Sequence, residues 1–304
     1  MAMALKHRSS APGSDDVDDF HVDEDEARRY RALERAWQDE VGSKLLDGPF
    51  DAPGSATVFE WQFDRLVELI DPDRAGVVIE IGCGRGHFLS RLRAAKGMQS
   101  RTLIGLDLSA AVRGLPERGL LGVQADGERL PFRAGTVDYV IYDGSLHHCI
   151  HYPNALREAV RVLAPGGSII IFEPVVSGFS QLMHRLLDPI VFRLCGTYES
   201  PIDQRYKGAF RREIVKRALT RQGLEVSETS SDFLAYPLTG CYAGSAFGRS
   251  ESLMRFVISV ERAIAATPLI GRLANSLAWR FTMIGTRPQG DGVQILHGTA
   301  AGAR

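Results

Sequence analysis

Residues 77–86 read VVIEIGCGRG, a short apolar run followed by three glycines at alternate positions. The run has the length and the Val and Ile content of a buried β-strand, and the apolar residues after it have helical spacing. Glycines between a strand and a helix let the backbone approach a ligand where a Cβ atom would clash. Because ligands of open α/β sheets bind at the carboxyl ends of the strands, this stretch predicts an α/β fold and a binding site.

Strand and helix signals alternate along the rest of the chain. Further strands are predicted at 102–106, 121–124, 137–142, 168–172, 224–233 and 280–286. Helices are predicted from residue 27 to 41, between 59 and 70, around 156–163, at 209–222 and within 250–278. Alternating strands and helices indicate a mostly parallel sheet that is covered by helices on both faces.

One large domain accounts for most of the 304 residues. Residues 11–26 hold eight acidic groups and no Lys or Arg, so self-repulsion predicts a disordered tail there, with a docking segment as the alternative. We predict a tail at 1–26, a single domain at 27–288 and a second tail at 289–304. Within the domain we expect N-terminal helices at 27–72, a binding core at 73–174, and a cap with the last strands at 175–288.

Composition narrows the class of protein. The formal net charge is −1, from 36 basic and 37 acidic residues, and this argues against nucleic-acid binding, which needs a basic surface. Four cysteines lie far apart without a CxxC pair, which suits a reducing compartment and predicts a cytoplasmic location. We expect neither a secretory signal peptide nor a transmembrane helix, since no uncharged stretch is apolar over a sufficient length.

The spacing of the glycines separates two cofactor chemistries. Dinucleotide-binding proteins use G-x-G-x-x-G, whose third glycine would fall at His87 in this chain. The spacing here is G-x-G-x-G, preceded by the acidic Glu80. A nicotinamide-dependent oxidoreductase is therefore disfavoured.

This segment, with several that follow in order, resembles the class I S-adenosylmethionine-dependent methyltransferases of the small-molecule type. The resemblance covers residues 79–174 and is carried by Glu80-x-Gly82-x-Gly84-x-Gly86, Asp107, Asp126 within ADGERLPF (125–132), VDYVIYDGSLHH (137–148) and RVLAPGG (161–167). It implies a Rossmann-like, seven-stranded sheet in the order 3-2-1-4-5-7-6, with the seventh strand antiparallel and helical cap insertions. It also implies that S-adenosyl-L-methionine is the cofactor.

The resemblance assigns cofactor contacts residue by residue. They are Glu80, Gly82, Cys83, Gly84, Gly86, Asp107, Leu108, Asp126, Gly127 and Asp143. Asp107 is expected to accept hydrogen bonds from the ribose hydroxyls, a task that suits a carboxylate because it has acceptor oxygens only. Asp126 is expected to meet the adenine amino group. Asp143 could touch the amino acid end of the cofactor or orient a histidine, and Cys83 is expected to contribute its backbone rather than its thiol.

Candidate catalytic residues follow the fourth predicted strand. A general base helps when the methyl acceptor is a hydroxyl, and histidine is suited to this role at neutral pH. His147 and His148 are the candidates, although either could instead pack or hold the loop. Glu173, at the end of the fifth strand, could bind a substrate hydroxyl or cap the loop after it. No metal is expected, because the histidines near His151 lack a matching carboxylate pattern.

Segments added to the core are expected to select the acceptor. Between residues 177 and 221, nine Lys and Arg stand against four Asp and Glu among many apolar residues. Such a segment could be an ordinary cap, a lid over a hydrophobic or lipid-linked acceptor, or a contact with a membrane surface, and 239–278 could also touch lipid. We predict a methyltransferase for a small-molecule acceptor, with O-methylation first and N- or C-methylation open. The alternative is a non-catalytic interaction protein with the same fold.

Overall fold

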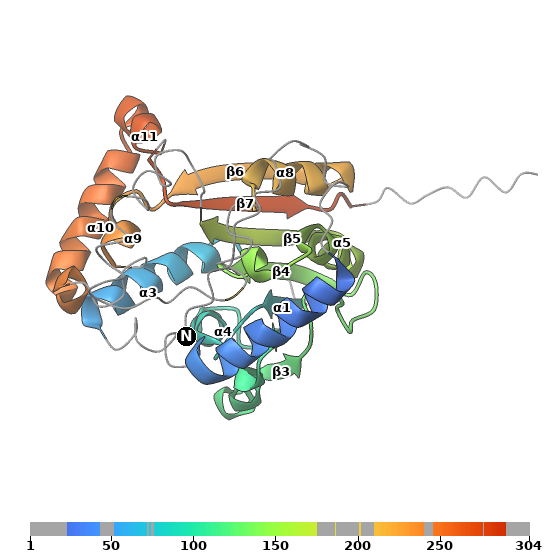
Figure 1. The fold of residues 1–304 in the computed structure, drawn as a ribbon. Coiled ribbons are helices and arrows are strands. Elements are labelled where there is room, and N and C mark those ends of the chain that lie inside the picture. Colours follow the sequence, from blue (N-terminus) through green and yellow to red (C-terminus); the bar gives the residue numbers. More distant parts are fainter. Residues whose placement is uncertain are drawn as a thin grey trace, which may run out of the picture.

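A computed structural model describes residues 23–42, 52–71, 73, 76–174, 186, 201, 210–239, 246–275 and 277–289. Its centre is a seven-stranded sheet in the order β3-β2-β1-β4-β5-β7-β6, which confirms the order that the family resemblance implies (Figure 1). The strands are β1 (Val77–Ile81), β2 (Thr102–Asp107), β3 (Leu121–Gln124), β4 (Val137–Asp143), β5 (Leu163–Pro174), β6 (Glu225–Ser231) and β7 (Arg280–Thr286). The first five strands pair in parallel, and β7 is antiparallel to both of its neighbours.

Two strands differ from the predicted bounds by more than one residue, for local reasons. β5 starts at Leu163, five residues early, because Leu163 already pairs with Val137 before a shift in register. The predicted turn at 165–167 is thus an irregularity inside the strand, at which Gly166 has φ +72°. β6 ends at Ser231, before the predicted residue 233, because Asp232 takes a positive φ of 63° that an extended strand cannot contain.

Helices cover both faces of the sheet. The longer ones are α1 (Glu24–Trp37), α3 (Pro53–Val67), α4 (His87–Ala94), α5 (Tyr152–Val162), α8 (Arg212–Arg221), α10 (Glu251–Ala265) and α11 (Pro268–Asn275). The shorter ones are η2 (Gln38–Gly42), η3 (Ala110–Gly114), η4 (Pro116–Arg118), η5 (Leu146–His148), α9 (Ala235–Thr239) and η6 (Ala246–Arg249). Apolar residues of α5 and α8 pack on one face of the sheet and those of α3 and α4 on the other, so the core has two halves.

The last residues of the predicted acidic tail form the start of a helix instead. Helix α1 begins at Glu24, and the Asp23 carboxylate caps it by accepting hydrogen bonds from the backbone of Asp25 and Glu26. Acidic side chains stabilise the positive end of a helix, so residues 23–26 belong to α1 and not to the tail. The predictions for residues 1–22 and 290–304, and most of the cap at 175–209, lie outside the described residues.

The antiparallel β7 begins at the edge of the sheet where the binding site is predicted. β1, β4 and β5 end at one edge, and β7 begins there, since its first residue Arg280 is paired with Pro174 at the end of β5. The side chain of residue 280 thus comes from the C-terminal part of the chain to the edge where the binding site is predicted. Within the described ranges, no helix is long and apolar enough to span a bilayer.

Candidate active site

The glycine loop is a sharp bend between β1 and α4 in which glycine is required. Gly82, Gly84 and Gly86 have φ values of +73°, +50° and +72°, which other residues rarely adopt. The Gly82 N–H donates to the Leu106 carbonyl at 2.7 Å and so ties the loop to the end of β2. A Cβ atom on Gly82 would lie 2.4 Å from the Cβ of Ser145, so the β4 loop also approaches this backbone closely.

Cys83 lies in this loop, and its side chain is buried. Burial, followed by the charges of Glu80 and Asp107, raises the pKa of the thiol far above its ordinary value. A thiol whose pKa is raised in this way is a poor nucleophile at neutral pH, so the backbone of Cys83 stays the expected contribution to the site.

Asp107 ends β2 beside the glycine loop. Its Oδ2 accepts from the Gly84 N–H and its Oδ1 from the Ser109 N–H, both at 2.8 Å. Each carboxylate oxygen has a second lone pair, so the half-buried group can accept further hydrogen bonds. The adjacent Leu108 is half-buried, and its carbonyl accepts from the Gln124 side chain at 3.2 Å.

Three carboxylates gather at this edge of the sheet. Glu80 is buried, and its Oε2 has no hydrogen-bond partner. Burial and the nearby charges of Asp143 and Asp107 raise the pKa of Glu80 well above its ordinary value. Burial also raises the pKa of Asp143, although Arg280 partly offsets this effect. A cationic ligand would relieve the repulsion among these groups, so the residues present fit a sulfonium cofactor that also carries an ammonium group.

Asp126 and Gly127 lie in the loop after β3. The Asp126 Oδ1 accepts from the Glu128 backbone at 2.9 Å, and its Oδ2 forms an ion pair of 3.3 Å with Nε of Arg31. A Cβ atom on Gly127 would approach the Ile81 side chain to 2.8 Å, so a glycine lets this loop pack on the end of β1. The loop thus lies beside the glycine loop, as a shared binding site requires.

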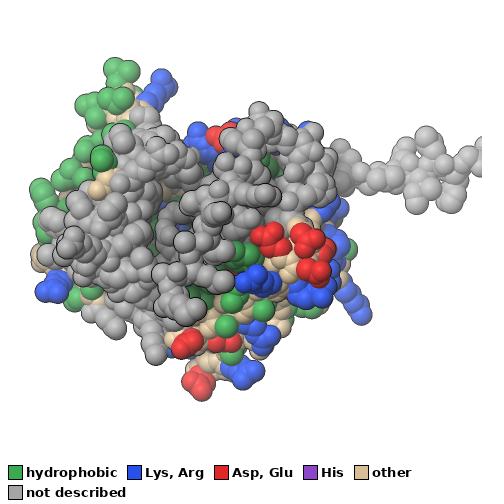
Figure 2. Space-filling view, in the orientation of Figure 1, with side chains coloured by type: hydrophobic (Ala, Val, Ile, Leu, Met, Phe, Trp, Pro, Cys, Tyr) green, Lys and Arg blue, Asp and Glu red, His purple; other side chains and the backbone are tan. Residues whose placement is uncertain are grey.

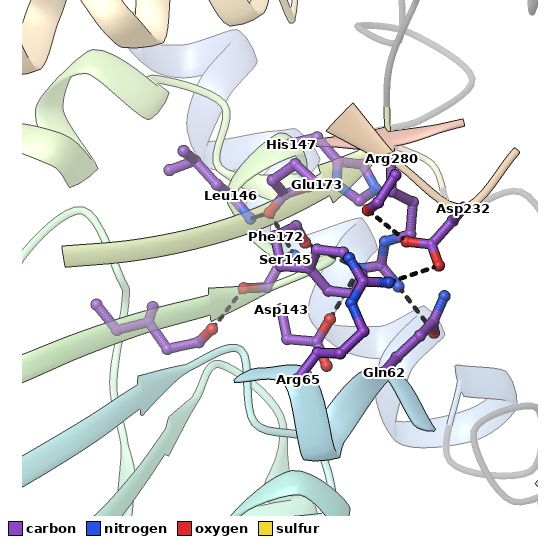
Figure 3. A network of polar contacts seen from close by, with 12 residues as sticks. Gln62, Arg65, Asp143, Ser145, Leu146, His147, Phe172, Glu173, Asp232 and Arg280 are labelled. Atoms are coloured by element: carbon purple, nitrogen blue, oxygen red, sulfur yellow. Dashed lines mark hydrogen bonds and ion pairs between the residues drawn. The ribbon is translucent and has the colours of Figure 1, made fainter. Parts of the chain in front are cut away.

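His147 is held by a buried glutamate. Its Nδ1 lies 2.5 Å from Oε2 of Glu173, whose other oxygen accepts from the backbone N–H groups of Ser145 and Leu146 at 2.8 and 2.6 Å (Figure 3). Ser145 also donates its hydroxyl to the Ile81 carbonyl at 2.5 Å. Glu173 therefore fixes the loop after β4, while the loop after β5, which the sequence suggested that it caps, lies outside the described residues. It also takes the histidine-orienting role that was one of two expectations for Asp143.

Asp143 instead pairs with an arginine from β7. Nη2 of Arg280 lies 2.7 Å from the Asp143 Oδ1 and donates to the Phe172 carbonyl at 2.8 Å (Figure 3). The guanidinium also lies over the Phe172 ring, 3.6 Å from its centroid, and a weaker contact of 3.4 Å joins it to Gln62. The pair is almost fully buried, so the charge of Asp143 is neutralised inside the protein and not by water.

A family model matches the part of the chain that holds the site. Residues 79–171, which contain the glycine loop, Asp107, Asp126, Asp143 and His147, match the family model described as a methyltransferase domain. The chain contains a class I methyltransferase domain. The cofactor of this domain is S-adenosylmethionine.

Curated relatives resemble only part of the chain. The demethylmenaquinone methyltransferase of Bacillus licheniformis is 27% identical over 132 residues, which cover 40% of this chain and 56% of the relative. The phthiotriol/phenolphthiotriol dimycocerosates methyltransferase of Mycobacterium leprae is 39% identical over 97 residues, covering 30% of this chain and 35% of the relative. The chain thus spans between about a third and two thirds of the length of the curated relatives it matches.

Solved structures agree in fold. A possible histamine N-methyltransferase from Thermotoga maritima has a TM-score of 0.51 and 18% identity, and the match covers 84% of this chain and 99% of that one. A putative methyltransferase bound to the Trm112 activator from Haloferax volcanii gives the same TM-score and identity, with 84% and 97% covered. At this identity the likeness shows the fold of the methyltransferase domain and nothing finer.

Helix α1 crosses the cofactor edge of the methyltransferase domain. Besides meeting Asp126, its Arg31 forms an ion pair with Glu128. Its buried Glu34 lies 3.2 Å from Nδ1 of His148. The Asp39 carboxylate of η2 accepts from the Ala110 backbone at 2.7 Å. The N-terminal segment therefore contacts the loops after β2, β3 and β4, and His148 serves this contact.

Sequence reasoning did not identify the residues that approach the site from outside the family segment. Arg31 and Glu34 have the spacing of an ordinary charged helix face, so nothing distinguishes them before the fold is known. Arg280 gave a usable signal, as the one charged residue of the otherwise apolar or hydroxylic stretch RFTMIGT (280–286). In the part of the chain that the structure describes, no cluster of His, Cys, Asp and Glu is placed to hold a metal ion.

Proposed function

We propose that this protein transfers the methyl group of S-adenosylmethionine to a hydroxyl of a small, hydrophobic or lipid-linked acceptor. The contact that carries the proposal is the one between His147 and Glu173, because it provides a base at the carboxylate-rich edge of the sheet. The names of two relatives support the acceptor class, since they specify demethylmenaquinone and phthiotriol dimycocerosates as the molecules that are methylated. The formal net charge of −1 agrees with a small-molecule acceptor and not a nucleic acid.

The chain's own residues would divide the work of the reaction. S-adenosylmethionine, when bound, supplies a methyl group that its sulfonium already activates. Glu80 and Asp107 would attract and orient the cationic cofactor, since neither forms an ion pair like that of Asp143 with Arg280. Positioning of this kind lowers barriers substantially, by up to about 7–11 kcal/mol for well-aligned reactants.

His147 would remove the proton of the acceptor hydroxyl. The Glu173 carboxylate lies 2.5 Å from Nδ1 and would accept a hydrogen bond from Nδ1–H, which would leave Nε2 as the basic nitrogen. When Nε2 takes the proton, the charge of the buried Glu173 stabilises the imidazolium that forms. The backbone N–H groups of Ser145 and Leu146 hold the glutamate in place during this step.

The test compares two neighbouring histidines. Purified protein is incubated with methyl-labelled S-adenosylmethionine and a lipid extract, and the labelled product is identified. His147→Gln is expected to lower kcat about 10²–10⁴-fold, because a general base contributes that much. His148→Gln is the matched control and should leave kcat close to that of the wild type, since His148 pairs with α1. Unchanged binding of S-adenosylhomocysteine would show that both variants are folded.

Two results would contradict the proposal. A labelled methyl group on carbon or nitrogen of the product would exclude O-methylation. Equal kcat values for His147→Gln and the wild type would exclude His147 as the base.

We also propose a cytoplasmic location. Cys83 and Cys149 are free thiols in the described part of the chain, and both are buried enough that their pKa values are raised. Free thiols are typical of reducing compartments.

A further inference from the structure

Two consecutive helices present large apolar side chains to solvent. Leu269 and Leu273 of α11 are 80% and 71% exposed, and Phe256 of α10 is 64% exposed. We call the group the hairpin patch, and its members are Leu253, Phe256, Leu269, Ile270, Leu273 and Leu277. Single exposed leucines are ordinary, but six large exposed apolar residues within one 25-residue segment, 253–277, indicate an interaction surface.

The opposite side of the same hairpin is firmly built into the domain. Met254 and Ile258 of α10 are buried in a small core with Val58 of α3. Helix α11 folds closely onto the end of α10, since a Cβ atom on Gly271 would lie 2.6 Å from the Ala265 carbonyl oxygen. The buried side of the hairpin therefore holds it on the domain, and the outward side chains are not needed for that packing.

The hairpin lies beside the edge of the sheet where the acceptor would bind. The Glu261 carboxylate of α10 accepts from the backbone of Phe233 at 3.0 Å and of Ala235 at 2.7 Å, just after β6 ends. The chain then runs from α11 directly into Arg280, the first residue of β7. In Figure 1, α9, α10 and α11 lie on the side of the molecule toward which β5 points.

Charged residues around the patch are mostly basic. The segment 246–277 contains four arginines and two glutamates, in a chain whose net charge is −1. Glu261 is buried, and Glu251 pairs with Arg255 on the helix surface. Figure 2 shows exposed apolar side chains with basic ones beside them over this part of the molecule. Apolar side chains bordered by arginines complement an anionic lipid surface, in which leucines enter the acyl boundary and guanidinium groups reach phosphates.

We propose that the hairpin patch docks this protein on an anionic lipid surface. A second copy of the chain fits the patch less well. A two-fold contact would place the patch against itself and so bring the arginines of one copy near those of the other.

The test measures co-sedimentation of the full chain with vesicles, without cofactor or acceptor. Phosphatidylglycerol vesicles are compared with phosphatidylcholine vesicles, and the first are expected to bind more protein. The triple variant Leu269→Ser, Ile270→Ser, Leu273→Ser should lower partitioning about 100-fold or more, because three inserted apolar side chains are lost. Leu121→Ser, which removes a 55% exposed leucine from β3, is the matched control and should partition like the wild type.

A second set of variants tests the charges. Replacing Arg255, Arg262 and Arg272 by glutamine should lower binding to the anionic vesicles about fivefold for each arginine and leave binding to neutral vesicles unchanged. The proposal is overturned if the wild type binds neither vesicle, or if the triple serine variant binds as the wild type does. A dimer that the same variant dissociates, with no vesicle binding, would assign the patch to a second copy. Because the assay needs no methyl transfer, its failure is distinguishable from failure of the proposed reaction.

Discussion

Arg280→Met is expected to destabilise the methyltransferase domain strongly, because it leaves Asp143 as a buried carboxylate without a cation. The wild-type guanidinium donates to Asp143 at 2.7 Å and to the Phe172 carbonyl at 2.8 Å. Removing one partner of a buried ion pair costs about 3–5 kcal/mol, mainly because the other charge remains buried. For a domain of this size about 1 kcal/mol corresponds to about 2–4 °C, so the expected fall in Tm is about 6–20 °C.

The loss of stability should depend on pH with a defined sign. Burial raises the pKa of Asp143 above its unfolded value, and Arg280 lowers it, so the variant has a still higher folded pKa. A carboxyl group with a raised folded pKa contributes stability below its unfolded pKa and loses it as pH rises through the folded value. The difference in Tm between the wild type and Arg280→Met should thus be larger at about pH 8 than at about pH 5.

Thermal unfolding of four proteins tests this reasoning. They are the wild type, Arg280→Met, Asp143→Asn and the double variant. If the uncompensated charge is the cause, Asp143→Asn should restore most of the Tm that Arg280→Met loses, and the two substitutions will be strongly non-additive. Equal Tm values for the double variant and Arg280→Met, or a loss that does not change with pH, would refute the assignment of the effect to charge.

Three further predictions concern the cofactor edge. Gly82→Ala should weaken S-adenosylhomocysteine binding in calorimetry at least about tenfold, whereas Gly135→Ala, with φ +70° and no atom near its Cβ, should leave it unchanged. Because the pKa of Glu80 is raised, affinity for S-adenosylmethionine should increase with pH, and Glu80→Gln should reduce this pH dependence. The affinity for S-adenosylhomocysteine, which lacks the sulfonium charge, should depend less on pH. Arg31→Ala should speed limited proteolysis within α1, with S-adenosylhomocysteine affinity reduced a few-fold, since two ion pairs are lost.

The sheet was predictable because its inner strands have an unambiguous pattern. β1 is the run VVIEI, bounded by glycine, and its predicted bounds are those observed. Strands that are buried on both faces read as continuous Val and Ile runs, so short windows of sequence suffice to find them. The order of the strands came from the family resemblance, since local patterns do not encode which strands are neighbours.

The contacts that the predicted site residues make were harder to predict from the sequence. Asp143 and Arg280 are 137 positions apart and meet only because β7 runs antiparallel beside β5. Glu173 could be placed at the end of a strand, but its contacts with the loop after β4 depend on the pairing of β4 with β5. Local sequence therefore predicts which groups stand at the edge, and tertiary pairing decides which of them touch.

The cofactor end of the candidate site and the groups around it come from different parts of the chain. This difference explains why the family model covers the first and not the second. The cofactor end consists of positive-φ glycines and acids at strand ends, all of which lie within the family segment 79–171. The groups that surround it come from outside that segment, namely Arg31 and Glu34 from α1, Glu173 from the end of β5 and Arg280 from β7. The family model thus covers the glycines and acids, and we expect the identity of the acceptor to depend more on the groups that lie outside residues 79–171.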